Sequence, residues 1–226
     1  MTATATATRP RSTKEQIVLA AERLFAERGY DGVSLREIGA AAGSGNNSAV
    51  QYHFGSKEQL VVAIFENRLT YIDERRAVLL AQLAPRDVRA WVECYVLPLL
   101  EQGEMEGSHY MSFVASVEHQ VGLFEHLPER FRARTQAFHE AVAALMPGIP
   151  EPLRSHRILQ VVRLSVHAAS ARERAKAQGL DVLPFALHVA DLLDGWAGFL
   201  QATASPDALA AVEGYRPRPL ALPFLV

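Results

Sequence analysis

Apolar residues recur at helical spacing along most of the chain, and short polar or glycine-rich stretches separate the runs. The first run has apolar residues at spacings of three, four and seven, which form one face of a helix: Ile17, Ala21, Leu24 and Phe25. Ser12 precedes this run and Glu15 follows three residues later, the arrangement of a capping box. Gly29 follows the last turn, as a helix-ending glycine does. The pattern therefore predicts a helix that begins at about residue 13.

Two more serines mark helix starts in the same way. Ser34 stands three residues before Glu37, and Ser56 stands three residues before Gln59. In such a box the serine hydroxyl accepts a hydrogen bond from a backbone N–H that the helix itself leaves unpaired. The boxes predict helices that begin at about residues 35 and 57, and a shorter helix over 48–54 fits between them.

After Pro85 the apolar spacing stays helical, and glycines and prolines divide it into five segments: 86–102, 108–125, 129–146, 152–178 and 184–204. Pro98 lies inside the first segment and should kink or split it. No stretch alternates with the period of two that marks a strand, so the sequence predicts an all-α fold. The apolar, proline-rich end over 214–226 is expected to dock on the helices.

The chain is expected to have three regions. Residues 1–11 are small, polar and repetitive, which is typical of a disordered arm. Residues 12–65 form a three-helix head, and residues 66–226 form a larger helical body. Three positive charges cluster around the start of the first helix: Arg9, Arg11 and Lys14. This basic arm suits contact with phosphates, and a solvated tail is the alternative.

Composition changes this picture little. Of the 226 residues 49% are hydrophobic and 21% are charged, which is ordinary for a globular protein with a buried core. The formal net charge is -2, and residues 1–60 carry seven Lys and Arg against six Asp and Glu, so the head is only slightly basic. No apolar run reaches the length of a membrane-spanning helix, and the expected location is the cytoplasm. The lone Cys94 lies among apolar residues and is expected to be a buried, inert thiol.

Residues 34–57 contain two short helices joined by a glycine-rich turn. Small residues in the first of them would let the two helices cross closely: Gly39, Ala40, Ala41 and Ala42. Gly43 and Gly45 tolerate the backbone angles of a tight turn, and Asn46 or Asn47 can cap the second helix. This is the layout of a helix-turn-helix, which presents its second helix to the DNA major groove.

The second helix carries side chains suited to reading DNA. Val50 and Phe54 are four residues apart and can both face inward. Polar and ring side chains are left facing outward: Asn47, Ser48, Gln51, Tyr52 and His53. Asn and Gln can bond the edge of adenine, while Arg36 and Lys57 on the neighbouring helices can bind phosphates. The alternative is a helical bundle without a DNA role, whose polar face is simply solvated.

Residues 12–65 resemble the DNA-binding head of tetracycline-repressor-type (TetR) regulators. The matching stretches are IVLAAERLFAERGYDGVSLREIGAAAG and YHFGSKEQL, in the order and near the end of the chain where this family carries them. The turn S-G-N-N-S is one residue longer than is usual in the family, and Gln51 stands where an aromatic residue is usual. The register of the DNA contacts therefore stays open.

The resemblance implies a homodimeric repressor that a small-molecule effector releases from a palindromic operator. A transcriptional activator and a non-specific architectural DNA-binding protein are the alternatives. It implies DNA contacts from these residues of the head: Arg36, Asn46, Asn47, Ser48, Gln51, Tyr52, His53 and Lys57.

The resemblance also implies that the body binds the effector and forms the dimer, through the helices near 152–178 and 184–204. One side of the first helix is apolar or small: Ile158, Val161, Val162, Ser165 and Ala169. The second helix has a comparable side: Leu187, Ala190, Leu193, Ala197 and Leu200. Each stripe could equally be core within one chain.

Rings and one thioether of the body are candidates to line an effector pocket: Trp91, Tyr95, Tyr110, Met111, Phe113, Phe124 and Phe138. The alternative is that they are ordinary core residues. The spacing of His, Cys, Asp and Glu predicts no metal site, and no cofactor motif is present. An enzyme with a DNA-binding-like head is disfavoured, because the sequence offers no nucleophile with a placed base and no phosphate loop.

Overall fold

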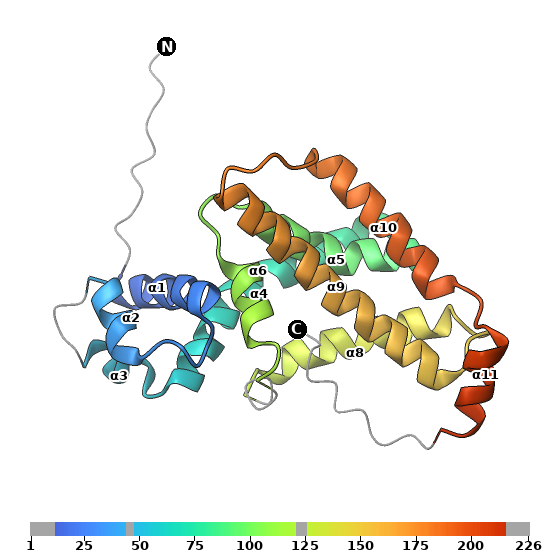
Figure 1. Cartoon of the computed structure of the whole chain (residues 1–226), viewed down its shortest axis with the longest axis horizontal. Helices are drawn as coiled ribbons and strands as arrows, with labels where there is room; N and C mark the ends of the chain where they lie inside the picture. The colour runs from blue at the N-terminus through green and yellow to red at the C-terminus, as the bar shows by residue number, and fades with distance from the viewer. Residues whose placement is uncertain (1–11, 44–47, 121–125, 216–226) are drawn as a thin grey trace, which may run out of the picture.

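The structure, a computed structural model, describes residues 12–43, 48–120 and 126–215 (Figure 1). These residues form helices and no strand, which confirms the predicted all-α fold. The helices are α1 (Thr13–Arg28), α2 (Leu35–Ala41), α3 (Ala49–Phe54), α4 (Lys57–Leu83), α5 (Val88–Glu104), α6 (Tyr110–Val117), α8 (Glu129–Ala144), α9 (Glu151–Ala177), α10 (Phe185–Gln201) and α11 (Pro206–Glu213). None of the described helices is long and apolar enough to cross a membrane.

Capping boxes start α1 and α2 at the residues that the sequence predicts. Ser12 accepts a hydrogen bond from the backbone N–H of Glu15 (3.3 Å), and the Glu15 carboxylate accepts one from the backbone N–H of Ser12 (2.7 Å). Ser34 and Glu37 make the same pair of bonds at 3.3 and 2.8 Å. Each box satisfies N–H groups that have no partner inside the helix, which is why the helix begins there.

Helix α4 joins the head to the body. It begins after Ser56, whose hydroxyl accepts a hydrogen bond from the backbone N–H of Gln59 at 3.2 Å. It then continues without a break through residue 65 to Leu83, so one rigid helix belongs to both regions. The head consists of α1, α2, α3 and the first turns of α4, and the remaining helices form the body (Figure 1).

Other helix boundaries differ from the prediction. The first described residue before α3 is its N-cap Ser48, and the predicted caps Asn46 and Asn47 lie outside the described residues. Helix α5 runs unbroken through Pro98, so the predicted split does not occur. A proline removes one backbone hydrogen bond, and the buried turns around Pro98 hold the helix together without it.

At the end of the chain, the sequence prediction missed α11. Ser205 caps this helix by accepting a hydrogen bond from the backbone N–H of Ala208 at 3.2 Å, and Pro206 follows it. Serine at the cap followed by proline in the first turn is a helix-start signal that the sequence does contain. The expected docking of the proline-rich end falls on residues 216–226, which lie outside the described residues.

One hydrophobic core continues from the head into the body. The rings of Phe25 (α1), Phe65 (α4) and Phe113 (α6) meet there, with centroids 6.1 Å apart for Phe25 and Phe113 and 5.3 Å apart for Phe65 and Phe113. Beside them the buried carboxylate of Glu22 (α1) accepts hydrogen bonds of 2.9 and 3.1 Å from Arg68 (α4). Apolar and charged contacts therefore fix the orientation of the head on α4 and α6.

Helices α9 and α10 lie along one side of the body (Figure 1). The apolar stripe that the sequence offered as a dimer face on α9 points into the chain, and each of its residues is at most 2% exposed: Ile158, Val161, Val162, Ser165 and Ala169. The interpretation of this stripe as core is therefore the correct one. On α10 the stripe is divided, because Leu193, Ala197 and Leu200 are buried while Leu187 is 54% exposed.

Candidate nucleic-acid interface and body cavity

Helix α3 is held on the head by the apolar side chains of Ala49, Val50 and Phe54. Val50 is buried, and a β-carbon built on Gly39 of α2 would lie 3.4 Å from its Cγ2, so the two helices meet there at van der Waals contact. Ala40 and Ala41 are exposed, so among the small residues of α2 it is Gly39 that allows the close approach. Phe54 is half-buried against the core, as the four-residue spacing predicts.

The remaining face of α3 points to solvent. Ser48, Gln51, Tyr52 and His53 are all exposed, and Tyr52 is 85% exposed. The rings of Tyr52 and His53 lie edge to face, with centroids 5.3 Å apart. A large ring left in water on a short helix contributes little to the fold, which makes it available to a partner. The structure thus brings four of the predicted DNA contacts together on one surface.

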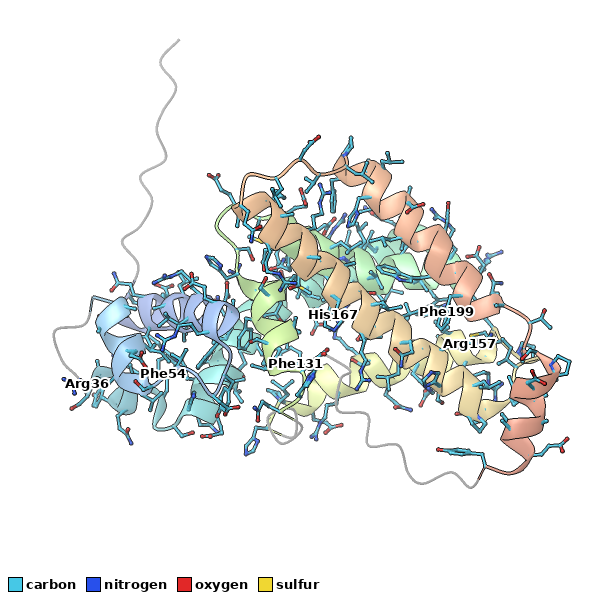
Figure 2. The ribbon with its side chains drawn as sticks, viewed as in Figure 1. Arg36, Phe54, Phe131, Arg157, His167 and Phe199 are labelled. Atoms are coloured by element: carbon cyan, nitrogen blue, oxygen red, sulfur yellow. The ribbon has the colours of Figure 1, made fainter. Side chains whose placement is uncertain are left out.

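Arg36 lies in the first turn of α2, exposed, at the edge of the head away from the body (Figure 2). Lys57 differs, because its ammonium group is turned into the head. It donates a hydrogen bond to the Tyr30 carbonyl and lies 4.2 Å from the Tyr30 ring centroid. Burial lowers the pKa of Lys57. The two predicted phosphate contacts therefore stand in different surroundings, and the contact of Lys57 with Tyr30 is not predicted by the sequence.

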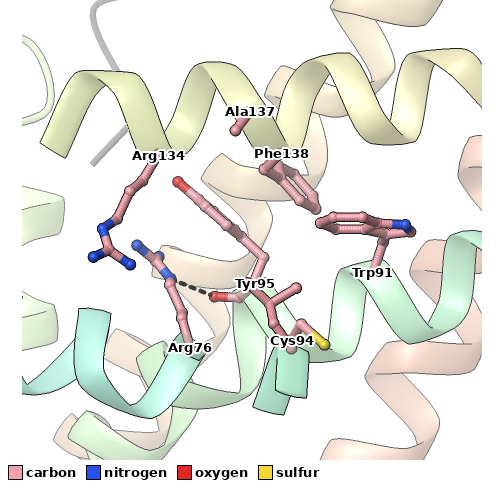
Figure 3. A pocket seen from close by; sticks show the side chains of 8 residues that line it. Arg76, Trp91, Cys94, Tyr95, Arg134, Ala137 and Phe138 are labelled. Atoms are coloured by element: carbon pink, nitrogen blue, oxygen red, sulfur yellow. Dashed lines mark hydrogen bonds between the residues drawn. The ribbon is translucent and has the colours of Figure 1, made fainter. Parts of the chain in front are cut away.

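A cavity of about 140 Å³ lies in the body between α4, α5 and α8 (Figure 3). Its walls are mostly apolar, with two guanidinium groups: Arg76, Leu80, Trp91, Cys94, Tyr95, Arg134, Ala137 and Phe138. Three of the predicted pocket residues, Trp91, Tyr95 and Phe138, line it. Tyr110, Met111 and Phe113 instead lie fully buried in the core, and Phe124 is outside the described residues.

The two arginines of the cavity were not anticipated from the sequence. They come from helices far apart in the chain, and both lie within ion-pair distance of Asp73: Arg76 at 3.6 Å and Arg134 at 3.3 Å. Arg76 also donates from Nε to the Tyr95 carbonyl at 3.3 Å, and its guanidinium lies 3.9 Å from the Tyr95 ring centroid. Tyr95 in turn stacks on Phe138 at 4.1 Å. These groups come together because α4 and α8 both pack against α5.

The head matches a known family. The model of bacterial regulatory proteins of the tetR family matches residues 17–64, which run from α1 through the first turns of α4. The head is therefore that of a TetR-family regulator. The match includes all of α2 and α3, so the surface formed by Ser48, Gln51, Tyr52 and His53 lies in the part that matches the helix-turn-helix of that family.

Characterised relatives resemble this chain mainly over the head. It is 38% identical over 60 residues to the HTH-type transcriptional repressor AcnR of Corynebacterium efficiens, covering 26% of this chain and 31% of that protein. It is 35% identical over 81 residues to the HTH-type transcriptional regulator CymR of Pseudomonas putida, covering 36% of this chain and 39% of that protein. The aligned part thus spans less than two fifths of the length of these relatives.

The fold of the whole chain is also similar to that of a solved structure. The crystal structure of NalD from Pseudomonas aeruginosa, described as the secondary repressor of a multidrug efflux pump, superposes with a TM-score of 0.52 at 22% identity. The superposition covers 84% of this chain and 97% of NalD. At this identity the likeness establishes the fold of the chain and nothing about its ligand.

Proposed function

We propose that this chain is a homodimeric transcriptional repressor of the cytoplasm, which leaves a palindromic DNA operator when a small molecule binds the body. The observation that carries the proposal is the solvent-facing surface of α3. Val50 anchors the helix, while Gln51, Tyr52 and His53 stay exposed. A helix-turn-helix protein reads DNA with such a surface in the major groove.

The side chains divide into base and phosphate contacts. Gln51 can bond both N6 and N7 of adenine, and Ser48 can serve several bases. Tyr52 and His53 can reach thymine methyls or phosphates, and Arg36 can bind the backbone beside them. Asn46 and Asn47 belong to the same proposed surface, although they lie outside the described residues.

Lys57 has a different part in this proposal. Its ammonium would have to leave the Tyr30 carbonyl and ring in order to reach a phosphate. We therefore assign it to holding the turn between α1 and α2, and through that turn the position of Arg36 and α3.

The proposed dimer uses the outer faces of α9 and α10. Large apolar side chains are exposed there: Leu164, Leu187 and Phe199 are 46%, 54% and 39% exposed. A β-carbon added to Gly195 or Gly198 of α10 would meet no atom within 4 Å, so packing within the chain does not require these glycines. Their small size leaves room for close approach by a second copy. A two-fold dimer matches the two half-sites of a palindromic operator.

The position of the cavity supports control by a ligand. Helix α4 lines the cavity with Arg76 and Leu80, and the same helix continues into the head. A ligand that changes how α4 packs on α5 and α8 would therefore change the spacing of the two heads. It must bind the released state more tightly than the DNA-bound state, since equal affinity shifts no equilibrium.

The test is selection of sequences from a random double-stranded DNA pool, followed by gel-shift assays on the enriched site. We expect a palindromic site whose binding weakens as salt rises, because phosphate contacts release counterions. The double variant Gln51→Ala, Tyr52→Ala should lose the enriched site, while the exposed control Thr70→Ala on α4 should keep it. Failure to enrich any sequence at low salt would refute the proposal.

A further inference from the structure

We propose that the cavity between α4, α5 and α8 binds a small aromatic monoanion, a single planar ring that carries one carboxylate. The carboxylate is held by Arg76 and Arg134, and the ring lies against Trp91 and Phe138. This inference rests on the proposed function, since it names the class of the effector.

The size of the cavity sets the size of the ligand. Its volume is about 140 Å³. An engineered protein cavity of about 150 Å³ with aliphatic and aromatic walls holds one benzene molecule. The body cavity therefore has room for one six-membered ring with a small substituent.

The charges of the cavity set the charge of the ligand. Arg76 and Arg134 carry two positive charges, and Asp73, which lies within ion-pair distance of both, carries one negative charge. Among these three groups the positive charges outnumber the negative one, which favours a ligand with a carboxylate. A second negative charge on the ligand would be repelled by Asp73, and a cation would be repelled by both guanidinium groups.

The surroundings of Arg76 indicate that the arginine end of the cavity binds a hydrogen-bond acceptor. Its side chain is 5% exposed, and its Nη2 is buried without a hydrogen-bond partner among the described residues. Its Nε is already used on the Tyr95 carbonyl. A buried donor without an acceptor is costly, and a carboxylate is the acceptor that a guanidinium matches best.

The opposite end of the cavity is apolar. Figure 3 shows the guanidinium groups of Arg76 and Arg134 at one end and the indole of Trp91 at the other, with Phe138 beside it. Cys94 adds no charge there, because burial raises the pKa of its thiol to about 11. Two rings in offset or edge-to-face contact gain about 0.5–1.5 kcal/mol beyond the burial of their area, so aromatic walls favour a ring. The cavity thus has a positively charged end and an apolar end, which match the carboxylate and the ring of the proposed ligand.

Three probes on the full-length chain test the ligand class, with binding measured by isothermal titration calorimetry. Benzoate has the ring and the charge, benzamide has the ring alone, and hexanoate has the charge without a ring. We expect benzoate to bind at least about tenfold more tightly than benzamide, the size of one charge-assisted hydrogen bond. We also expect it to bind more tightly than hexanoate, which lacks the ring contacts with Trp91 and Phe138. Benzamide as tight as benzoate, hexanoate tighter than benzoate, or no binding of benzoate at millimolar concentration would each overturn the inference.

Two arginines of α8 provide a matched pair of variants. Arg134 and Arg132 are about equally exposed, at 47% and 50%, but Arg132 pairs with Glu129 and does not line the cavity. Arg134→Met should weaken benzoate about tenfold and leave benzamide unchanged, and Arg132→Met should change neither. Equal effects of the two variants on benzoate would assign the binding to general surface charge and overturn the inference. Arg76→Met should weaken the binding of benzoate further. If the Arg76→Met protein does not fold, the comparison of Arg134→Met with Arg132→Met still tests the inference.

The outcomes separate this inference from the proposed function. A chain that binds a specific DNA site but not benzoate would overturn the ligand class and leave the repressor intact. A chain that binds benzoate as described but enriches no DNA sequence would overturn the proposed function and leave the cavity assignment intact.

Discussion

The carboxylate of Glu173 on α9 accepts a hydrogen bond of 2.8 Å from the backbone N–H of Ser112, in the first turn of α6. Its other oxygen accepts one of 3.3 Å from the backbone N–H of Met111. The local N-cap residue of α6, His109, makes no side-chain cap bond. A buried carboxylate from another helix therefore supplies the cap, and it fixes α6, the helix on which the head packs, to the long helix of the body.

Replacing this cap should destabilise the fold. In Glu173→Gln one carboxylate oxygen becomes an N–H₂ group that cannot accept, so a buried backbone N–H loses its partner. We expect the free energy of unfolding to fall by about 1–3 kcal/mol, measured by urea denaturation. Glu74→Gln, at an exposed position of α4, is the control and should stay within about 0.5 kcal/mol of the parent. An unchanged midpoint for Glu173→Gln would show that the cap does not contribute.

The head should respond to acid through Glu37. Hydrogen bonds from the Ser34 hydroxyl and backbone N–H, followed by the Arg28 guanidinium, lower the pKa of Glu37 from 4.5 to about 2. Because the folded pKa is below the unfolded value, this carboxylate stabilises the fold above pH 4.5, and its contribution is lost as the pH falls from 4.5 towards 2. NMR titration of the Glu37 carboxyl carbon measures this directly. Ser34→Ala should raise the pKa, and a pKa near 4.5 in the parent protein would contradict the capping geometry.

Cys94 should be unreactive in the folded protein. Its thiol is 2% exposed, and burial raises its pKa to about 11. Only about one thiol in a thousand is then ionised at pH 8, and the thiolate is the reactive form. We expect labelling by a disulfide reagent at pH 8 to be slow in buffer and complete within minutes in urea. Rapid labelling in buffer, with the protein folded by circular dichroism, would contradict the burial.

Gln51 and Arg36 should affect DNA binding in different ways. Gln51→Ala removes a base contact, and we expect a loss of about 1–3 kcal/mol on the enriched site, with relaxed specificity at one base pair. Arg36→Ala removes a phosphate contact and should weaken all sequences alike, while the slope of log affinity against log salt falls by about 1. Gel shifts over a salt series with single-base variants of the site measure both. If Arg36→Ala instead loses specificity at one base pair, Arg36 contacts a base and its assignment to a phosphate is wrong.

A large charged residue at Gly198 should separate the dimer without harming the chain. A β-carbon at this position meets no atom within 4 Å, and arginine is a better helix former than glycine by up to about 1 kcal/mol. Gly198→Arg is therefore expected to be a monomer by light scattering, with the same helix content as the parent by circular dichroism. Thr70→Arg on α4 introduces the same charge elsewhere and should stay dimeric. A Gly198→Arg protein that remains dimeric would place the interface elsewhere.

The sequence by itself determined the helices and the character of the head. Serine caps are local chemistry, because the hydroxyl and the N–H that it satisfies lie three residues apart, so Ser12 and Ser34 fix helix starts in any context. The spacing of Val50 and Phe54 likewise decides which face of α3 turns outward. The same local logic predicted that Cys94 would be buried.

Only the tertiary structure decided how distant residues are used. The α9 stripe that includes Ile158 could have served a dimer or the core, and packing against α5 and α6 made it core. The sequence predicts Lys57 to be a surface cation, but in the folded chain its ammonium group donates a hydrogen bond to the Tyr30 carbonyl. Arg76 and Arg134 meet at Asp73 because α4 and α8 both pack against α5 in the body. These outcomes depend on which helix faces pack against each other. The order of residues along the chain does not specify which distant helices come into contact.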